Sequence, residues 1–441
     1  MNIEQFVRPL PRYTSYPTVP EWGEMDEASY CKALKEGGDR ASVYIHIPFC
    51  PSQCLYCGCS TIVSRDKKVK QRYLQVLLKE IELIHKVGGR KKVVHLHFGG
   101  GSPTVLSQKD IALILDALSI GSDSVLSFEV DPRAMLRKKN YLSMLNQLGF
   151  RHISFGVQDF DPYVQKKIGR MQPYEDVKGV FEEARSFSFT SINFDLIYGL
   201  PGSKQESFLQ TIEKTIELRP HRIALFSYAH MPQIKKHQSI FSLEEMPTPQ
   251  EKFQIFSASR ERLQAAGYIP IGMDHFALPE DQLAKAFEKK QLIRTFQGYM
   301  EDRGISQIGL GLTSIGSVGG NFFQNTKDIE RYIEEIERGC LPIEKGKICT
   351  QDDMVRGYVI SQLMSHFEVD KRRFQELFCQ SFDHYFSKEL VSLDAFFETF
   401  FENRKDKLVI LEEGALFLRH IASCFDTYLH KSRKQSFSLS I

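Results

Sequence analysis

Four of the nine cysteines lie within ten residues, at Cys50, Cys54, Cys57 and Cys59. Thiols spaced this closely are metal ligands far more often than core residues. A structural zinc site normally uses two separated cysteine pairs, or one pair with downstream histidines, and no such second half follows here. Three cysteines in one short loop can instead hold three irons of a [4Fe–4S] cube and leave the fourth iron open, as in a catalytic metal site. The spacing favours a reactive iron–sulfur cluster, with a structural zinc knot or a disulfide cluster as the alternatives.

The sequence around these cysteines resembles the signature of radical S-adenosylmethionine (SAM) enzymes, in which an aromatic residue, here Tyr56, precedes the third cysteine. In that superfamily the open iron binds the amino and carboxylate groups of SAM. One electron then splits SAM into methionine and a 5′-deoxyadenosyl radical. The longer string YIHIPFCPSQCLYCGCSTIV is similar to one family, the oxygen-independent coproporphyrinogen III oxidases. The strings PRYTSYPT and CFDTYL extend the resemblance to both ends of the chain.

The resemblance implies a reaction, two cofactors and a set of site residues. The reaction is the oxidative decarboxylation of two propionate side chains of coproporphyrinogen III to vinyl groups, giving protoporphyrinogen IX for haem biosynthesis. Cys50, Cys54 and Cys57 would hold the cluster, whereas the family does not use the residue at Cys59 as a ligand. The residues implied around the cluster-bound SAM are Tyr44, Gly100, Glu129 and Ile315. Those implied around a second SAM are Tyr56, Gly101, Ser102, Gln158, Arg170, Asp195 and Ala229.

Two of these positions depart from the family's pattern: Ser102 replaces the threonine of GGGTPT, and Tyr56 replaces another aromatic residue. The resemblance also implies an external electron donor of the flavodoxin or ferredoxin type. No side chain is assigned as catalytic beyond the cluster and SAM, and none to the carboxylates of the substrate.

The elements that must position these residues follow a regular rhythm. Strand-like runs separated by helix-patterned segments recur at about thirty-residue steps, the size of βα units. The strands are expected at 43–47, 93–98, 125–130, 152–157, 191–197 and 222–228, and the helices at 67–85, 107–118, 134–148, 174–187 and 203–218. Six such units form a parallel barrel or partial barrel. The pattern does not decide between six and eight strands, and the resemblance implies an open (β/α)6 barrel.

Active sites of such barrels form at the carboxyl ends of the strands. Polar or glycine-rich groups stand at these ends, in 99–104, 129–132, 158–159, 195 and 228–230. A single carboxylate there is usually a loop residue or a helix cap. Acidic or amide groups on three consecutive strand ends favour a ligand, because carboxylates hold ribose hydroxyls well.

We expect three parts in the chain. Residues 1–40 form a proline- and aromatic-rich arm over the active site, with a poorly ordered terminus as the alternative. Residues 41–345 form the barrel and an extension, in which 272–277 is expected as a loop with exposed polar groups. Residues 346–441 form a smaller, mostly helical, winged-helix-like domain. Its first helix follows a capping box at Thr350 and Asp353, its hairpin spans 408–411 and 415–418, and its last helix carries 424–429.

The composition is ordinary for a soluble globular protein, with 42% apolar and 25% charged residues and a formal net charge of +2. This charge does not favour nucleic acid as a partner, and no apolar run reaches the length of a membrane span. Nine cysteines without a signal-peptide pattern favour a cytoplasmic protein, which we expect to be a monomer. The rival interpretations are a haem chaperone on the same scaffold and a non-enzymatic iron–sulfur protein. Such chaperones usually lack the final cysteine and the arm.

Overall fold

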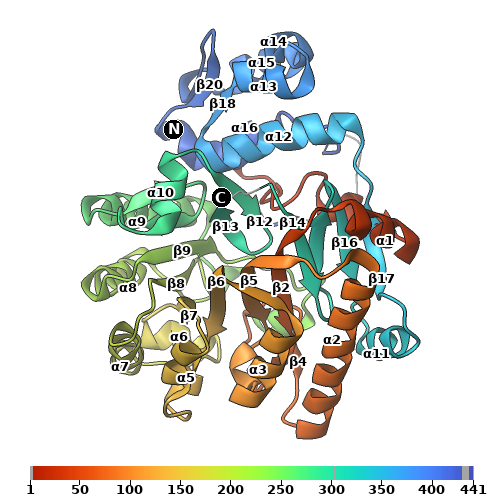
Figure 1. Cartoon of the computed structure of the whole chain (residues 1–441). Coiled ribbons are helices and arrows are strands. Elements are labelled where there is room, and N and C mark those ends of the chain that lie inside the picture. The colour runs from red at the N-terminus through yellow and green to blue at the C-terminus, as the bar shows by residue number, and fades with distance from the viewer. Residues whose placement is uncertain (1–2, 302–303, 430–436, 441) are drawn as a thin grey trace.

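A six-stranded parallel sheet forms the centre of the computed structural model, which describes residues 3–301, 304–429 and 437–440 (Figure 1). Its strands run in chain order, as expected of consecutive βα units. They are β2 (Arg40–Ile47), β5 (Lys92–Gly100), β6 (Ser119–Val130), β7 (His152–Gln158), β8 (Ser191–Tyr198) and β9 (Arg222–Ser227). Each strand is followed by helix, so the prediction of six βα units is confirmed.

The helices of these units are α2 (Lys67–Gly88), α3 (Gln108–Ala117), α4 (Pro132–Met135), α5 (Tyr141–Gln147), α6 (Pro162–Lys167), α7 (Tyr174–Arg185), α8 (Gln205–Leu218) and α9 (Pro249–Ala265). The longest, α2, begins at the cap Asp66, whose carboxylate accepts the Lys68 N–H. It buries a face that contains Tyr73, Leu77 and Ile81. The single helix expected over 134–148 is wrong. The chain forms α4 and α5 instead, because Asn140 takes a left-handed conformation with φ 65°.

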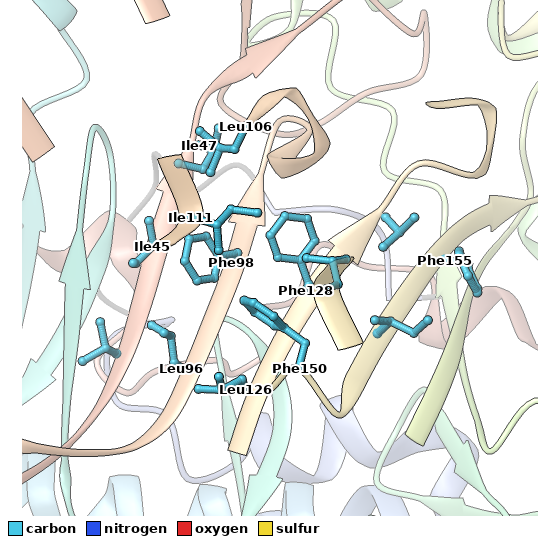
Figure 2. Close-up of a cluster of buried hydrophobic side chains, with 14 of the residues drawn as sticks. Ile45, Ile47, Leu96, Phe98, Leu106, Ile111, Leu126, Phe128, Phe150 and Phe155 are labelled. Atoms are coloured by element: carbon cyan, nitrogen blue, oxygen red, sulfur yellow. The ribbon is translucent and has the colours of Figure 1, made fainter. Parts of the chain in front are cut away.

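The two faces of the parallel sheet differ in chemistry. Figure 2 shows Ile45, Phe98 and Phe128 packed together with Ile111 of α3 on the helix-facing side, and the rings of Phe98 and Phe128 stack at 5.4 Å. Neighbours along these strands point the other way, since side chains alternate. Tyr44, His97 and Ser127 therefore line up in register on the inner face. An apolar outer face and a polar inner face fit a barrel with a ligand site inside.

Both edges of the parallel sheet are extended by strands that the sequence pattern does not reveal in full. One edge continues through β14 (Ser306–Leu310), which is parallel to β2, and then antiparallel through β15 (Ile315–Val318), β16 (Asn321–Asn325), β17 (Ile343–Lys347) and β1 (Gly23–Glu24). The other edge continues through β11 (His275–Ala277) and β10 (Ile269–Ile271). The partial barrel is thus the middle of a thirteen-stranded sheet.

The expectation of an exposed loop at 272–277 is wrong. Residues 275–277 form β11, which pairs with β9, and Asp274 and His275 are buried. The polar residues are tolerated inside because each has a partner. Arg294 of β12 (Leu292–Thr295) donates two hydrogen bonds to the Asp274 carboxylate at 2.8 and 2.9 Å, and His275 lies 2.7 Å from it.

The remaining elements before residue 350 are short or lie at the edges. They are η1 (Ile3–Phe6), η2 (Val19–Glu21), α1 (Glu27–Glu36), β3 (Phe49–Cys50), β4 (Ile62–Val63), η3 (Pro103–Val105), η4 (Lys236–Ile240), η5 (Leu243–Glu245), α10 (Gln282–Glu288), β13 (Gly298–Glu301) and α11 (Ile329–Glu337). Of these, β3 and β4 pair on either side of the cysteine loop and fix its two ends.

The carboxyl-terminal region is mostly helical and carries a small three-stranded sheet (top of Figure 1). It contains α12 (Gln351–His366), β18 (Glu368–Asp370), α13 (Lys371–Phe378), α14 (Phe382–Tyr385), α15 (Ser387–Phe397), η6 (Glu398–Phe400), β19 (Phe401–Asn403), β20 (Lys407–Ile410), η7 (Glu413–Phe417) and α16 (Leu418–Ser423). The capping box of Thr350 and Asp353 opens α12 as predicted. This order of helices and hairpin is the winged-helix-like arrangement that we expected.

Two details of this region were wrongly predicted. The hairpin pairs β19 with β20, whereas 415–418 belongs to η7 and α16. Buried Phe417, Leu418 and Ile421 follow a helical spacing, which explains the difference. The last helix ends at Ser423, and the Asp426 carboxylate accepts backbone N–H groups in the turn that follows.

The amino-terminal residues pack into the core of the carboxyl-terminal region. Ile3, Phe6, Tyr13 and Tyr16 are buried in one cluster with residues of α12 to α16. Arg419 of α16 donates hydrogen bonds to the carbonyl groups of residues 10 and 11. The expected arm and carboxyl-terminal domain also include residues 1–2, 430–436 and 441, which lie outside the described ranges. That the arm covers an active site stays a prediction.

Candidate active site

The cysteine loop is held by its main chain, which leaves the thiol groups free to bind a ligand. Its amide groups contribute two bonds, from Leu55 N–H to Ile168 O and from Cys57 N–H to Cys54 O. Three side chains that follow β9 lie 2.8 Å from its carbonyl oxygens: Gln238 at Tyr56, His237 at Cys57 and Lys235 at Cys59. All nine cysteines are free thiols, so the disulfide alternative is not what the chain forms.

Positive charge surrounds the thiol of Cys54. The guanidinium groups of Arg170 and Arg133 lie 3.6 and 3.7 Å from its Sγ, and Asp131 lies between them, 3.5 Å from Arg170 and 2.7 Å from Arg133. Hydrogen bonds from cationic groups stabilise a thiolate ligand more than a thiol. The two guanidinium groups beside Cys54 are therefore suited to a cysteine that binds metal as a thiolate.

The other thiols differ in how readily they ionise. Burial, followed by the neighbouring Cys57 and Cys54, raises the pKa of Cys50 to about 12. A hydrogen bond from Cys59 lowers the pKa of Cys57 to about 6. Metal binding would require each ligand thiol to ionise, and Cys59 acts on Cys57 as a hydrogen-bond partner.

The arrangement fits a cluster with one iron per thiolate. Within the described ranges, no three His, Cys, Asp or Glu side chains converge on one point as the ligands of a single ion do. A [4Fe–4S] cube does not require such convergence, because each cysteine binds its own iron. Cys50, Cys54 and Cys57 therefore have the donor chemistry that the cluster needs.

Beside this loop, the structure joins Tyr44, Gly100 and Glu129 in one network on the inner face of the sheet. Glu129 accepts the Gly100 N–H at 3.1 Å and lies 3.2 Å from His97 Nε2. The Tyr44 ring stacks on His97, and its hydroxyl lies 3.1 Å from His46 Nδ1. Three strand positions thus present a carboxylate, a phenol and a bare backbone edge together.

Gly100 itself tolerates no side chain. Its φ is 112°, and a Cβ there would lie 2.7 Å from the His46 ring. Ile315 begins β15, and its backbone packs against Gly309, which is paired with Tyr44. The four residues implied for the cluster-bound SAM therefore lie on one stretch of the sheet, on β15, β2, β5 and β6, with β14 between β15 and β2.

A second polar group lies on β7 and β8. Arg170 donates to Gly156 O at 2.7 Å, and a Cβ at Gly156 would lie 2.8 Å from the Gln158 amide nitrogen and 3.0 Å from the Arg170 guanidinium. Gln158 adopts a left-handed conformation with φ 70°, which a non-glycine residue rarely takes without a functional or packing reason. Gln158 and Arg170 thus stand side by side.

Asp195 is buried next to this group. Ser154 Oγ and Asn193 Nδ2 donate to its carboxylate at 2.9 and 2.8 Å. Burial, and then the charge of Glu129, raises the pKa of Asp195 to about 6. Asp195 thus lies within reach of the charge of Glu129.

The other implied residues lie at the rim of the barrel interior. The Gly101 N–H bonds to Ile47 O, and a Cβ at Gly101 would lie 2.8 Å from Pro48 O. The hydroxyl of buried Ser102 is engaged by Thr104 Oγ1 at 2.7 Å. Tyr56 packs with Val164, Ile168, Leu200 and Tyr228, the last of which precedes Ala229. The structure therefore brings all eleven implied residues to one end of the barrel.

Sequence reasoning missed three polar residues here: His46, His97 and Arg133. The histidines alternate with apolar residues on β2 and β5, so the period-2 pattern that predicts the strands could also have placed them on the inner face with Tyr44. Nothing in the local sequence pointed Arg133 toward Cys54, because the two lie 79 positions apart.

Comparisons with known proteins agree with this geometry. The Radical SAM superfamily profile matches residues 44–215. Oxygen-independent coproporphyrinogen III oxidase of Pseudomonas aeruginosa is 38% identical over 440 residues, covering 97% of this chain and 95% of the relative. The enzyme of the same name from Escherichia coli is 37% identical, covering 99% of this chain and 97% of the relative.

A solved structure gives the same result. Coproporphyrinogen III oxidase (HemN) from Escherichia coli, described as a radical SAM enzyme, superimposes with a TM-score of 0.90 at 36% identity, covering 94% of this chain and 97% of that one. Identity at this level over nearly the full length of both chains extends well beyond the cysteine loop. The chain belongs to the family of oxygen-independent coproporphyrinogen III oxidases, within the radical SAM superfamily.

Proposed function

We propose that this chain catalyses the oxygen-independent oxidative decarboxylation of two propionate side chains of coproporphyrinogen III, giving the vinyl groups of protoporphyrinogen IX. The observation that carries the proposal is the cysteine loop beside a polar interior, in a chain that matches named oxidases from end to end. A non-enzymatic iron–sulfur protein would not need polar residues on successive strands of the inner face.

The chain's own residues would bind and orient the cofactors. When bound, the cluster and SAM supply a 5′-deoxyadenosyl radical that takes a β-hydrogen from a propionate, after which CO2 and one electron leave. Cys50, Cys54 and Cys57 would hold the cluster. Arg133 and Arg170 would offset its negative charge at Cys54. The Gly100 backbone and Glu129 would meet the amino and hydroxyl groups of SAM, in a barrel interior that limits access of water.

We also propose that the chain holds a second SAM. Tyr56, Gly101, Ser102, Gln158, Arg170, Asp195 and Ala229 would surround it. Within the described part of the chain, Arg170 Nε and Asn193 Oδ1 are buried without a hydrogen-bond partner, and buried polar atoms rarely lack one. A bound ligand would satisfy them. Equilibrium dialysis with labelled SAM under anaerobic conditions would count the sites, and one SAM per wild-type chain would exclude the second.

Further parts of the proposal concern the surroundings of the enzyme. The electron would come from an external flavodoxin- or ferredoxin-like protein, and the enzyme would act as a cytoplasmic monomer. The chain would divide into an arm (1–40), a barrel with its extension (41–345) and a carboxyl-terminal domain (346–441). Among the helices of the described ranges, none has the length and apolar character needed to span a membrane.

An anaerobic assay tests the proposed function. The cluster-loaded chain is mixed with coproporphyrinogen III, SAM and a reductant, and the porphyrins are separated after oxidation. We expect protoporphyrin, with two SAM consumed per product. Binding of haem without any vinyl product would instead favour the haem chaperone. SAM cleavage without consumption of coproporphyrinogen would point to another substrate.

A further inference from the structure

A pocket lies between the amino-terminal residues, α9 and the carboxyl-terminal region. It adjoins the carboxyl ends of β8 and β9, where Tyr198 and Ser227 line it. The stacked rings of Phe253 and Phe417 join α9 to η7 beside it. Three segments far apart in the sequence thus enclose a space that borders the candidate active site.

Three cationic side chains line this pocket: Arg12, Lys252 and Arg419. In the part of the chain that the structure describes, none of them forms an ion pair with a carboxylate. The one acidic residue that lines the pocket is Asp274, and its carboxylate is already taken by Arg294 and His275. The pocket therefore holds an excess of positive charge.

The three cationic side chains differ in how many N–H groups remain available to a ligand. Arg419 donates hydrogen bonds to the carbonyl groups of residues 10, 11, 438 and 439, and these bonds tie the two ends of the chain together. Arg12 donates through Nη2 to Ser227 O at 2.6 Å, and its guanidinium makes no other hydrogen bond to the residues that the structure describes. Lys252 Nζ donates to no group among the described residues. Arg12 and Lys252 thus retain N–H groups for a ligand.

The crowding of these charges costs free energy in the absence of an anion. Burial, and then the neighbouring Arg12, lowers the pKa of Lys252 to about 8 and that of Arg419 to about 9. Buried like charges destabilise each other, and an anion between them relieves both the repulsion and part of the desolvation. Such an arrangement benefits the protein only if an anion binds between these charges.

The register of β8 and β9 fixes the position of this pocket relative to the reacting centre. Asp195 pairs with Ala224, and Tyr198 pairs with Ser227 three positions later. Because side chains alternate along a strand, Asp195 faces the barrel interior, whereas Tyr198 and Ser227 face α9. Tyr198 and Ser227 are also the last residues of β8 and β9, so a group bound in the pocket lies at the carboxyl ends of these strands, at the rim of the interior in which the cluster-bound SAM would lie.

We propose that Arg12 and Lys252 bind the carboxylate of a substrate propionate that is not decarboxylated. The inference rests on the proposed function, because the substrate has four propionates and only two react. The guanidinium group of Arg12 would form charge-assisted hydrogen bonds with the carboxylate, and Lys252 would add a point charge. Anchoring an unreacted propionate at this rim would set which side chains of the macrocycle reach the interior.

Binding and kinetics with Arg12→Gln and Lys252→Gln test this role. Coproporphyrin III serves as the stable probe for binding to the cluster-free chain, followed by fluorescence. We expect each variant to weaken its binding at least tenfold and to raise the KM for coproporphyrinogen III by a similar factor. The kcat should stay within about twofold, and SAM cleavage without substrate should not change. Protoporphyrin IX, which keeps two propionates, should lose affinity similarly.

Matched variants separate charge from structure. Lys252→Arg keeps the charge and should bind coproporphyrin III within about threefold of wild type. Arg262→Gln removes an exposed cation from the same helix, where it pairs with Glu213, and should change nothing. If Arg12→Gln fails to fold, Lys252→Gln still decides, because the Lys252 ammonium group makes no hydrogen bond within the described ranges whose loss would disturb the fold.

Several outcomes would overturn the inference. Unaltered affinity and KM in Lys252→Gln would do so, as would a fall in kcat alone. Inorganic phosphate that competes with coproporphyrin III in the same concentration range would make this a site for small anions. A wild-type chain that makes no vinyl product would refute the proposed function instead. If the wild type forms vinyl products and the variants have the same KM as the wild type, only this inference is refuted.

Discussion

Replacing Arg294 by methionine removes one partner of a buried ion pair and should strongly destabilise the protein. The side chains of Arg294 and Asp274 are each only 4% exposed and share two hydrogen bonds. Burial alone would raise the pKa of Asp274, but Arg294 holds it well below its usual range. Leaving a buried carboxylate without its cation costs about 3–5 kcal/mol, and we expect a loss in this range.

Two further variants isolate the pair. Arg294→Met with Asp274→Leu removes both charges and should recover most of the loss. About 1–3 kcal/mol should remain, because Arg294 Nε also donates to Arg12 O at 3.0 Å. Arg72→Met is the matched exposed control. Its pair with Glu337 spans 3.3 Å with side chains 59% and 48% exposed, so its loss should be below about 1 kcal/mol.

The assay is urea unfolding of the cluster-free chain, followed by far-ultraviolet circular dichroism and by fluorescence of Trp22. This sole tryptophan is buried against Phe322 and reports on the amino-terminal segment that Arg294 holds through Arg12. The reasoning is refuted if Arg294→Met unfolds at the same urea concentration as Arg72→Met. It is equally refuted if the double variant is no more stable than the single one.

Four other variants test the cluster, the second SAM and the core. Cys54→Ala should abolish the reconstituted cluster, whereas Cys59→Ala should keep four irons per chain. Iron and sulfide counts measure both. Loss of the cluster from Cys59→Ala alone would reverse the assignment. Because burial and Glu129 raise the pKa of Asp195 to about 6, SAM bound per wild-type chain should rise toward two as the pH passes through about 6. Asp195→Asn should stay near one in the same dialysis, and a pH-independent count in wild type would contradict this. Burial raises the pKa of Glu80 from 4.5 to about 7, so its contribution to stability is full below about pH 4.5 and is lost as the pH rises through 7. The wild-type unfolding free energy should therefore fall relative to Glu80→Gln across this window, and parallel pH profiles would show that the carboxyl does not titrate there.

The sequence predicted those elements of the fold whose formation depends on residues that are close together in the chain. The alternation around Val43, Ile45 and Ile47 and the helical face of α2 each depend on a few neighbouring residues, so the βα rhythm could be read from the sequence. The edge strands could not, because β11 forms by pairing with β9 and β10, beside Asp274 buried against the distant Arg294. Similarly, Ile3 and Phe6 join the carboxyl-terminal core across more than 350 positions.

The residues of the candidate site also divide into those that local sequence predicts and those that distant contacts position. The cysteine spacing and the polar strand ends are local signals, and the structure brings the implied residues together. The groups that surround them, such as Arg133 at Cys54, are set by the packing of distant segments. Arg12 and Lys252 are 240 positions apart in sequence, and only the docking of the amino-terminal segment on α9 brings them to one pocket.

The most direct test of the account follows the hydrogen that leaves the substrate. Coproporphyrinogen III carrying deuterium at the β-positions of its propionates is incubated anaerobically with the cluster-loaded chain, SAM and a reductant, and 5′-deoxyadenosine is analysed by mass spectrometry. We predict one deuterium in 5′-deoxyadenosine for each vinyl group formed. Vinyl groups formed with 5′-deoxyadenosine that carries no deuterium would contradict the account.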